Sequence, residues 1–94
     1  MQQITEQDLK EYILGKQQWS ALLVQGEGCK WCELLKPELA KLEENKKTPY
    51  KMFTIIGTEK IQKLLEVKDF PTLIVYEYGF EVKREVGYFN IKAM

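Results

Sequence analysis

The stretch Trp19–Cys32 (WSALLVQGEGCKWC) is the part of the sequence that decides the fold. It contains an uninterrupted apolar run, Ala21–Val24, which predicts a buried strand covered on both faces, as in a parallel sheet. It ends in Cys29-Lys30-Trp31-Cys32, a Cys-x-x-Cys motif that holds both cysteines of the chain. The charged, amphipathic residues 33–46 that follow predict a helix. The sequence therefore predicts a strand, a short loop and a helix, with paired thiols at the helix start.

The long helix is expected to begin at or near Cys29. Leu35, Leu39 and Leu42 recur with the helical period and should form its apolar face. Pro37 lies inside the helix and removes one backbone hydrogen bond, so we expect a kink there.

A shorter helix is predicted near the N-terminus. Thr5 and Asp8 have the spacing of a capping box, with Asp in the place usually held by Glu or Gln. Gly15 is expected to end this helix. Its apolar face consists of Leu9, Tyr12 and Ile13.

The second half of the chain predicts further strands. Residues 50–56 follow the long helix, so they should run parallel to the first strand with a right-handed crossover. Thr58 is expected to cap a short helix. Residues 72–76 and 81–86 should pair as a hairpin, and the charges of the second strand are typical of a sheet edge. The residues expected on the buried side of the short helix are Ile61, Leu64 and Leu65. The aromatic residues expected in the core or on sheet faces are Trp19, Tyr76 and Tyr78.

Composition narrows the class of protein. The chain has 94 residues, so residues 1–94 are expected to form one domain. Its 14 basic and 14 acidic residues balance, which gives no electrostatic support for a nucleic-acid partner or an acidic membrane. No apolar run approaches the roughly 20 residues of a membrane span, and residues 1–10 are too polar for a secretion signal. We therefore expect a cytoplasmic protein with no nucleic-acid or membrane partner, whose thiols are kept reduced.

Thiols at a helix start favour redox chemistry. Cysteines at this spacing lie on one side of a helical turn, so their sulfur atoms can bond to each other. The free N–H groups and the dipole of the first turn stabilise a thiolate at such a position. Cys29 is therefore the predicted nucleophile toward a substrate disulfide, and Cys32 is predicted to resolve the mixed disulfide. Lys30 adds positive charge beside Cys29, whereas Glu27 and Glu33 add negative charge. The sequence therefore does not determine the sign of the electrostatic potential at Cys29.

Two other interpretations of the cysteine pair compete with redox chemistry. A zinc or iron site needs four ligands, and this chain has two cysteines and no histidine, so only a dimer would complete one. We therefore expect no metal and no cofactor other than a redox-active disulfide of Cys29 and Cys32. Alternatively, both cysteines are inert buried residues, which a loop position directly after Gly28 disfavours. Trp31 either stacks on a substrate or covers the disulfide as an apolar lid.

Several motifs of the chain resemble those of the thioredoxin family. Cys29-Lys30-Trp31-Cys32 stands at the position of the family's active-site motif, and Pro37 at that of its helix proline. Phe70-Pro71-Thr72 is similar to the family's cis-proline loop, and Thr72–Tyr76 to the strand after it. Gly79 and Gly87 match glycines that flank the last strand. The resemblance extends from Thr5 to about Tyr88.

The resemblance implies a thioredoxin-like α/β fold with a four-stranded mixed sheet and flanking helices, in which the first strand and the C-terminal helix are reduced or absent. It also implies a thiol–disulfide oxidoreductase of electron transport and cell redox homeostasis, which reduces disulfides of proteins or small molecules. The catalytic residues would be Cys29, Cys32 and a cis Pro71, and the substrate-binding residues Phe70, Trp31 and Lys30.

The chain departs from the family beside the motif. Lys30 and Trp31 replace the usual Gly and Pro, Gly28 replaces a tryptophan, and Leu23 replaces a buried acid. A glutaredoxin-like role and a non-catalytic peptide-binding module are therefore the alternative functions. The expected partners are disulfide-containing proteins and an upstream thiol reductase or glutathione. Because a reduced C-terminal helix would leave one sheet face thinly covered, we expect a monomer or a weak dimer.

Overall fold

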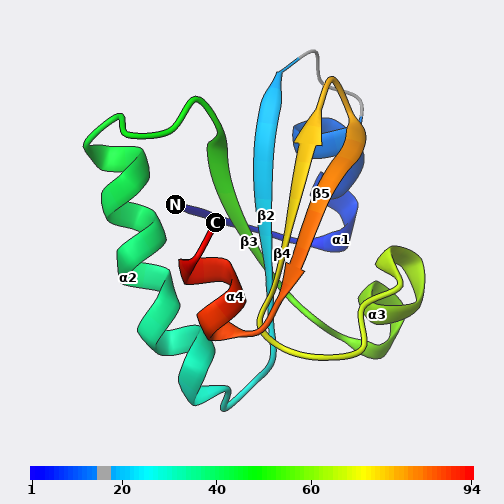
Figure 1. Cartoon of the computed structure of the whole chain (residues 1–94). Coiled ribbons are helices and arrows are strands. Elements are labelled where there is room, and N and C mark those ends of the chain that lie inside the picture. Colours follow the sequence, from blue (N-terminus) through cyan, green and yellow to red (C-terminus); the bar gives the residue numbers. More distant parts are fainter. Residues whose placement is uncertain (15–17) are drawn as a thin grey trace.

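The computed structural model describes residues 1–14 and 18–94 and shows a mixed β-sheet with helices on both faces (Figure 1). Within those residues the sheet has five strands, in the order β1-β3-β2-β4-β5. They are β1 (Gln2–Ile4), β2 (Trp19–Gln25), β3 (Lys51–Ile56), β4 (Thr72–Glu77) and β5 (Phe80–Val86). β3 is parallel to β1 and β2, whereas β4 is antiparallel to β2 and β5. The predicted mixed sheet is confirmed, with β2 at its centre.

The prediction of a four-stranded sheet is wrong by one strand, because β1 pairs with the outer edge of β3. Gln2 is the partner of Phe53, and Ile4 is the partner of Ile55. β1 has three residues, and Ile4 is the one that is buried. A strand this short does not show the alternation of apolar and polar residues by which strands are recognised in a sequence. The family's first strand is thus present in a short form.

In the described residues the helices are α1 (Glu6–Leu9), α2 (Lys30–Glu44), α3 (Glu59–Leu65) and α4 (Tyr88–Lys92), and α1 continues into a π-helical segment, Lys10–Leu14. Of these, α1 and α3 begin at the predicted capping residues, Thr5 and Thr58. The backbone N–H of Thr5 donates to the carboxylate of Asp8 at 3.0 Å. Thr58 Oγ1 accepts the N–H of Ile61 at 3.3 Å. The predicted helix end at Gly15 lies outside the described residues.

The sheet separates two apolar cores. Figure 1 shows α1 and α3 on one face of the sheet, and α2 and α4 on the other. Alternate residues of β2 point to opposite faces, so Leu22 and Val24 join the first core, whereas Ala21 and Leu23 join the second. These four side chains are at most 1% exposed. The continuous apolar run of β2 therefore reflects burial on both faces, as predicted.

The C-terminal helix α4 is five residues long, which confirms that it is reduced. It buries Ile91 in the second core, together with Leu35 and Leu39 of α2. No helix of residues 1–14 and 18–94 is long and apolar enough to cross a membrane.

Two aromatic residues expected to be structural are exposed. Trp19 starts β2 at the end of the sheet and is 38% exposed, with its ring stacked on Tyr50 at 5.6 Å between centroids. Tyr78 lies in the hairpin turn with a positive φ of 56° and is 55% exposed. Tyr76, inside β4, is buried as predicted.

Two leucines expected on apolar helix faces are exposed as well. Leu64 is 55% exposed, because a helix of seven residues turns a single row, Ile61 and Leu65, toward the sheet. Leu42 is 41% exposed, because the last turn of α2 extends beyond the cover that α4 provides, whereas Leu39 is buried. Helical periodicity places these side chains on the correct side of each helix but does not predict how far the opposing layer reaches.

Candidate active site at the start of helix α2

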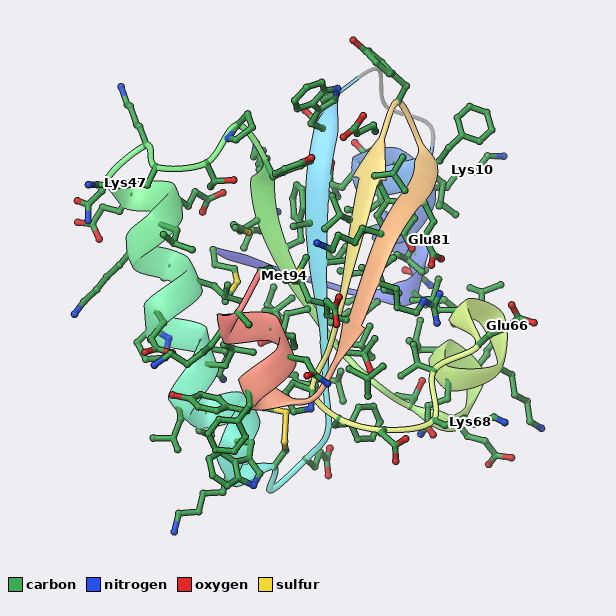
Figure 2. The ribbon with its side chains drawn as sticks, in the orientation of Figure 1. Lys10, Lys47, Glu66, Lys68, Glu81 and Met94 are labelled. Atoms are coloured by element: carbon green, nitrogen blue, oxygen red, sulfur yellow. A yellow bond between two sulfur atoms is a disulfide. The ribbon has the colours of Figure 1, made fainter. Side chains whose placement is uncertain are left out.

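The two cysteines lie at the junction between the end of β2 and the start of α2. Gly26–Gly28 connects the two elements, and Gly28 has a φ of 68°, a left-handed conformation that favours glycine. The N–H of Cys29 donates to the carbonyl of Gly26 at 3.3 Å, which closes the turn. Cys29 is the N-cap residue of α2 and forms a disulfide with Cys32, drawn as a yellow bond in Figure 2. Their Cα atoms are 5.2 Å apart.

The two sulfur atoms have different environments. Cys32 is 0% exposed, whereas Cys29 is half-buried and lines a surface groove. The backbone N–H of Cys32 donates to Sγ of Cys29 at 3.2 Å. A hydrogen-bond donor and the positive end of the helix dipole both stabilise negative charge on that sulfur. Of the two sulfur-bearing residues, Cys29 is therefore the accessible one, and Cys32 is enclosed.

The groove beside Cys29 has a volume of about 500 Å³ and is also lined by Phe70. The Phe70–Pro71 peptide bond is cis. The carbonyl of Pro71 accepts the N–H of Gly87 at 2.8 Å, and Thr72 Oγ1 donates to the carbonyl of Asp69 at 2.6 Å. These two hydrogen bonds hold the loop residues 69–72 in place. The predicted residues Cys29 and Phe70 therefore line the same groove.

Two glycines pack against the ring of Phe70, and neither was predicted from the sequence to belong to the site. A Cβ atom on Gly26 would come within 2.6 Å of Cδ2 of Phe70, and one on Gly57 would overlap the same ring. Gly26 and Gly57 directly follow β2 and β3, which are parallel neighbours. Only glycine allows another side chain to approach the backbone this closely. Two glycines at the carboxyl ends of adjacent parallel strands were therefore a sequence signal for a side chain packed at that edge of the sheet.

Three aromatic rings pack together near the start of α2. The ring of Trp31 lies 5.1 Å from that of Tyr88 and 5.4 Å from that of Phe89, measured between centroids. Trp31 is 47% exposed and Phe89 is 70% exposed. We call Trp31, Tyr88 and Phe89 the aromatic cluster. Tyr88 and Phe89 were missed by the sequence analysis, although two consecutive aromatic residues after Gly87 were a signal.

Helix α4 is tied to α2 by polar contacts as well. Lys92 forms an ion pair with Glu38 at 3.1 Å, and the hydroxyl of Tyr88 donates to the same carboxylate at 3.4 Å. The hydrogen bond from Lys92 to Glu38 raises the pKa of Lys92 above its ordinary value, with a further contribution from Tyr88. The aromatic cluster therefore rests on a helix that is anchored to the active-site helix.

Charged groups around the disulfide are at the surface. Lys30 is exposed in the first turn of α2, and Glu27 is exposed beside the groove. Glu33 forms an ion pair with Lys36 at 3.0 Å, which offsets part of its charge. Among Lys30, Glu27 and Glu33, only Glu33 has an ion-pair partner within residues 1–14 and 18–94.

The buried sheet residues beneath α2 are uncharged. Leu23 is fully buried there, at the position where the family has an acid. Gln25 Nε2 donates to Thr54 Oγ1 at 2.9 Å, and Thr54 Oγ1 donates to the carbonyl of Leu23 at 3.1 Å. The buried polar side chains of the described residues are Ser20, Gln25, Thr54 and Thr72, and none of them is charged. In the described ranges, no group of three or more His, Cys, Asp or Glu residues is placed to hold a metal ion.

Comparison with known proteins identifies the fold. No protein-family model and no curated protein matches the sequence. Among solved structures, the chain is similar to thioredoxin f2 of Chlamydomonas reinhardtii, with a TM-score of 0.86, 21% identity, and coverage of 99% of this chain and 89% of that one. It is also similar to thioredoxin of Fasciola hepatica, with a TM-score of 0.84, 21% identity, and coverage of 99% and 92%. The corresponding values for thioredoxin of Malassezia sympodialis are 0.82, 15%, 99% and 84%.

The chain therefore has the thioredoxin-like fold that its motifs predicted. Within that fold, a Cys-x-x-Cys disulfide occupies the junction of the central strand and the helix that follows it.

Proposed function

We propose that this protein is a thiol–disulfide oxidoreductase that reduces disulfides of proteins or small molecules. The observation that carries the proposal is the pairing of Cys29 and Cys32 at the helix start, with Sγ of Cys29 at a groove and Cys32 enclosed behind it. A structural disulfide has no need of a hydrogen-bond donor aimed at one sulfur, whereas a leaving or attacking thiolate is stabilised by one.

The reaction uses the two sulfur atoms in turn. The thiolate of Cys29 attacks one sulfur of the substrate disulfide, so a mixed disulfide forms and the first substrate thiolate leaves. Cys32, after losing its proton, attacks Sγ of Cys29, which releases the second substrate thiolate and closes the Cys29–Cys32 disulfide. The substrate gains two electrons and two protons, and the protein is oxidised by the same amount. An upstream thiol reductase or glutathione then restores the dithiol.

The groove supplies the substrate contacts. Phe70 lines the groove together with Cys29, and its backbone precedes the cis Pro71. Trp31 and Lys30 are exposed in the first turn of α2, directly after Cys29 in the chain. We assign Phe70 and Pro71 to binding the peptide chain around the cystine, and Trp31 with Lys30 to contacts beside it. In this proposal residues 1–94 act as one redox domain in a reducing compartment such as the cytoplasm.

Insulin reduction in the presence of dithiothreitol tests the proposal. The wild-type chain should accelerate precipitation of the insulin B chain, and Cys29→Ser should abolish that acceleration. Cys32→Ser should instead trap mixed disulfides through Cys29, which mass spectrometry identifies. If the wild-type protein binds insulin peptides without accelerating their reduction, the protein is a peptide-binding module and the redox proposal is wrong.

A further inference from the structure

The pairing of β5 with β4 contains a β-bulge, and the bulge determines where the charged side chains of β5 lie. Val75 is the partner of Lys83. Tyr76, the next residue of β4, is the partner of Glu81, so Val82 is the extra residue on β5. In a regular strand Glu81 and Lys83 would share one face of the sheet, because side chains two residues apart do so. The bulge separates them.

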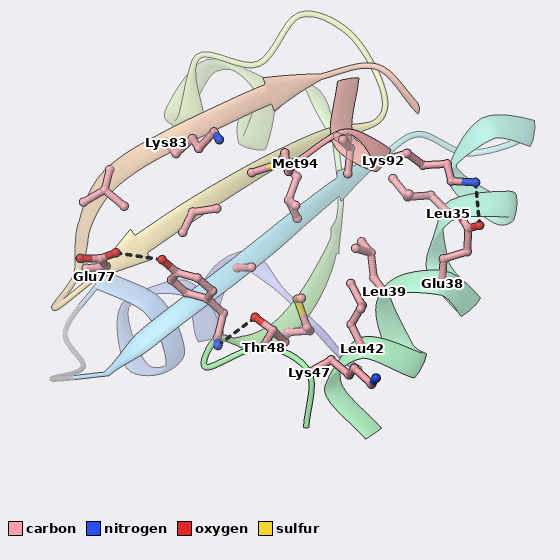
Figure 3. A pocket seen from close by; sticks show the side chains of 17 residues that line it. Leu35, Glu38, Leu39, Leu42, Lys47, Thr48, Glu77, Lys83, Lys92 and Met94 are labelled. Atoms are coloured by element: carbon pink, nitrogen blue, oxygen red, sulfur yellow. Dashed lines mark hydrogen bonds and ion pairs between the residues drawn. The ribbon is translucent and has the colours of Figure 1, made fainter. Parts of the chain in front are cut away.

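The bulge brings Glu81 and Arg84 to the face of the sheet that carries α3. Their partners on β4 are Tyr76 and Ile74, which both belong to the first core, and directly opposed residues of antiparallel strands share a face. Lys83 lies on the other face, where it lines a hollow between α2, the sheet and α4 (Figure 3). Glu81 and Arg84 are three residues apart, a spacing that places side chains on opposite faces of a regular strand.

Glu81 holds the guanidinium group of Arg84. Nε of Arg84 donates to Oε2 of Glu81 at 2.8 Å, and Nη2 donates to Oε1 at 2.7 Å. This bidentate pairing fixes the plane of the guanidinium group as well as its position. The hydrogen bond to Glu81 also raises the pKa of Arg84, so the group stays charged over the physiological pH range.

Further N–H groups of Arg84 reach the end of α3. Nη1 donates to the carbonyl of Glu66 and Nη2 to the carbonyl of Leu65, each at 2.8 Å. Figure 2 shows Glu66 and Glu81 on the same side of the sheet. The last carbonyls of a helix have no partner within the helix and carry the negative end of its dipole, so a cation is favourable there. Arg84 therefore fixes the point at which the chain leaves α3.

The segment that leaves α3 forms one wall of the groove beside Cys29. Residues 68–70 line that groove together with Cys29. The segment ends at Pro71, whose carbonyl accepts the N–H of Gly87 at 2.8 Å. Gly87 directly follows β5. The last strand thus anchors this wall at its start through Arg84 and at its end through Gly87.

We propose that Glu81 and Arg84 are positioning residues for substrate binding, because they hold the start of residues 67–71 and so present Phe70 to a protein substrate in a fixed geometry. A wall held in one conformation binds a peptide with less loss of conformational entropy. The inference rests on the proposed function, since the groove serves a substrate only if Cys29 exchanges disulfides with it. Arg84 acts through the wall, and its hydrogen bonds go to Glu81 and α3.

Arg84→Lys is the decisive variant, because it keeps the charge but loses the planar group that donates to a carboxylate and two carbonyls at once. It should lower kcat/KM for insulin reduction about three- to tenfold, mainly through a higher KM. Reduction of hydroxyethyl disulfide, which is too small to extend along the groove wall, should be unchanged, as should alkylation of Cys29 by iodoacetamide. Glu81→Gln should have a smaller effect in the same direction, because Arg84 keeps its bonds to the two carbonyls.

Amide hydrogen exchange tests the anchoring without redox chemistry. The N–H of Val67 donates to the carbonyl of Gln62 at 2.9 Å, close to the start of the wall, and the N–H of Gly87 donates to Pro71 at its end. In oxidised Arg84→Lys both amides should exchange about threefold faster or more, relative to the amides of the central strand β2. Faster exchange at Gly87 would show that the loosening extends to the cis proline.

Two variants serve as controls. Ile13→Val removes a methyl group from the first core and lowers stability without touching the groove wall. Glu85→Gln makes the same change of charge as Glu81→Gln on the same strand, but Glu85 pairs with Leu73 of the second core and so lies on the other face. Neither control should change KM for insulin or the relative exchange of Gly87.

The proposal is overturned if Arg84→Lys leaves either KM for insulin or the exchange of Gly87 as in the wild type. It is also overturned if insulin and hydroxyethyl disulfide lose equally, or if Ile13→Val raises KM as much. A wild-type protein that does not reduce insulin would refute the proposed function and the substrate role together. Unchanged exchange of Gly87 in a protein that does reduce insulin would refute the positioning role alone.

Discussion

The indole ring of Trp31 and the phenol ring of Tyr88 lie 5.1 Å apart, so the Cys-x-x-Cys motif is in direct contact with helix α4. Phe89 packs against both rings, with centroids 5.4 Å from Trp31 and 5.2 Å from Tyr88. The side chain between the two cysteines is therefore supported by the last helix of the chain. A side chain that is both supported and half exposed is a suitable contact for a protein substrate, because little conformational entropy is lost when the substrate binds.

Phe89→Ala should lower kcat/KM for insulin reduction about three- to tenfold, because an exposed aromatic contact contributes on the order of 1 kcal/mol. Reduction of a small aromatic disulfide, which is too small to span the aromatic cluster and the groove, should be unchanged. Phe80→Ala is the matched control, since Phe80 is 76% exposed in the distant hairpin. Equal losses for insulin and the small disulfide would contradict a role in substrate contact.

Iodoacetamide should label Cys29 before Cys32 in the reduced protein at mildly acidic pH. Cys29 is half-buried at the groove, whereas Cys32 is 0% exposed, and alkylation requires an accessible thiolate. Peptide mapping after short exposure measures the order, and the single variants Cys29→Ser and Cys32→Ser give the separate rates. Preferential labelling of Cys32 would reverse the roles of nucleophile and resolving thiol.

Gly57→Ala should destabilise the fold by about 1–3 kcal/mol, because the added methyl group overlaps the ring of Phe70 in a closely packed site. Denaturant unfolding measures the loss. Phe70→Ala removes the ring, so the two substitutions together should destabilise less than the sum of the single effects. Strict additivity would show that the ring and Gly57 do not constrain each other.

Stability should fall on the alkaline side because of Tyr76. Burial raises the pKa of Tyr76 to about 12, from 10.0 in an exposed phenol. Between these values the unfolded chain loses the proton and the folded chain retains it, so the stabilisation is complete below pH 10 and is lost as the pH rises through 12. The difference corresponds to about 2–3 kcal/mol. Tyr76→Phe should therefore flatten the decline in unfolding free energy, and an equally steep decline would assign it to other groups.

Lys30→Glu should make the reduction potential more negative by about 10–20 mV, because reversing an exposed charge near Cys29 destabilises the thiolate by up to about 1 kcal/mol. With no buried acid at Leu23, we expect the wild-type potential to lie above about −270 mV, nearer the range of roughly −200 to −230 mV. Equilibration against glutathione buffers gives both values. A wild-type potential well below −270 mV would show that Glu27 and Glu33 outweigh Lys30.

The parts of the fold and site that the sequence predicted are those encoded over short distances. Cys29 and Cys32 are adjacent on one helical turn, and the apolar runs of β2 and β4 are long enough for strands to be recognised. Thr58 and Thr5 identify helix starts because a cap acts on residues within one turn. In each case the residues that interact are also neighbours in the sequence.

The features that were missed depend on contacts between distant segments. Ile4 forms an edge strand only because β3 offers it an unpaired partner. Gly57 matters because Phe70 comes from another loop to pack against it. Tyr88 belongs to the site because α4 returns to the start of α2. The glycines after β2 and β3 and the aromatic pair after Gly87 mark these positions in the sequence, but neither signal says which distant residue packs there.

The burial of Cys32 also has a consequence for oxidation of the reduced protein. Because Cys32 is enclosed, a peroxide should reach the sulfur of Cys29 first and convert it to a sulfenic acid. Since Cys32 lies within one helical turn, its thiol should condense with that sulfenic acid, release water and form the Cys29–Cys32 disulfide. Under the proposed function, peroxide should thus yield a form that a thiol reductant rescues, and hyperoxidation should require a second oxidant to arrive before the neighbouring thiol reacts.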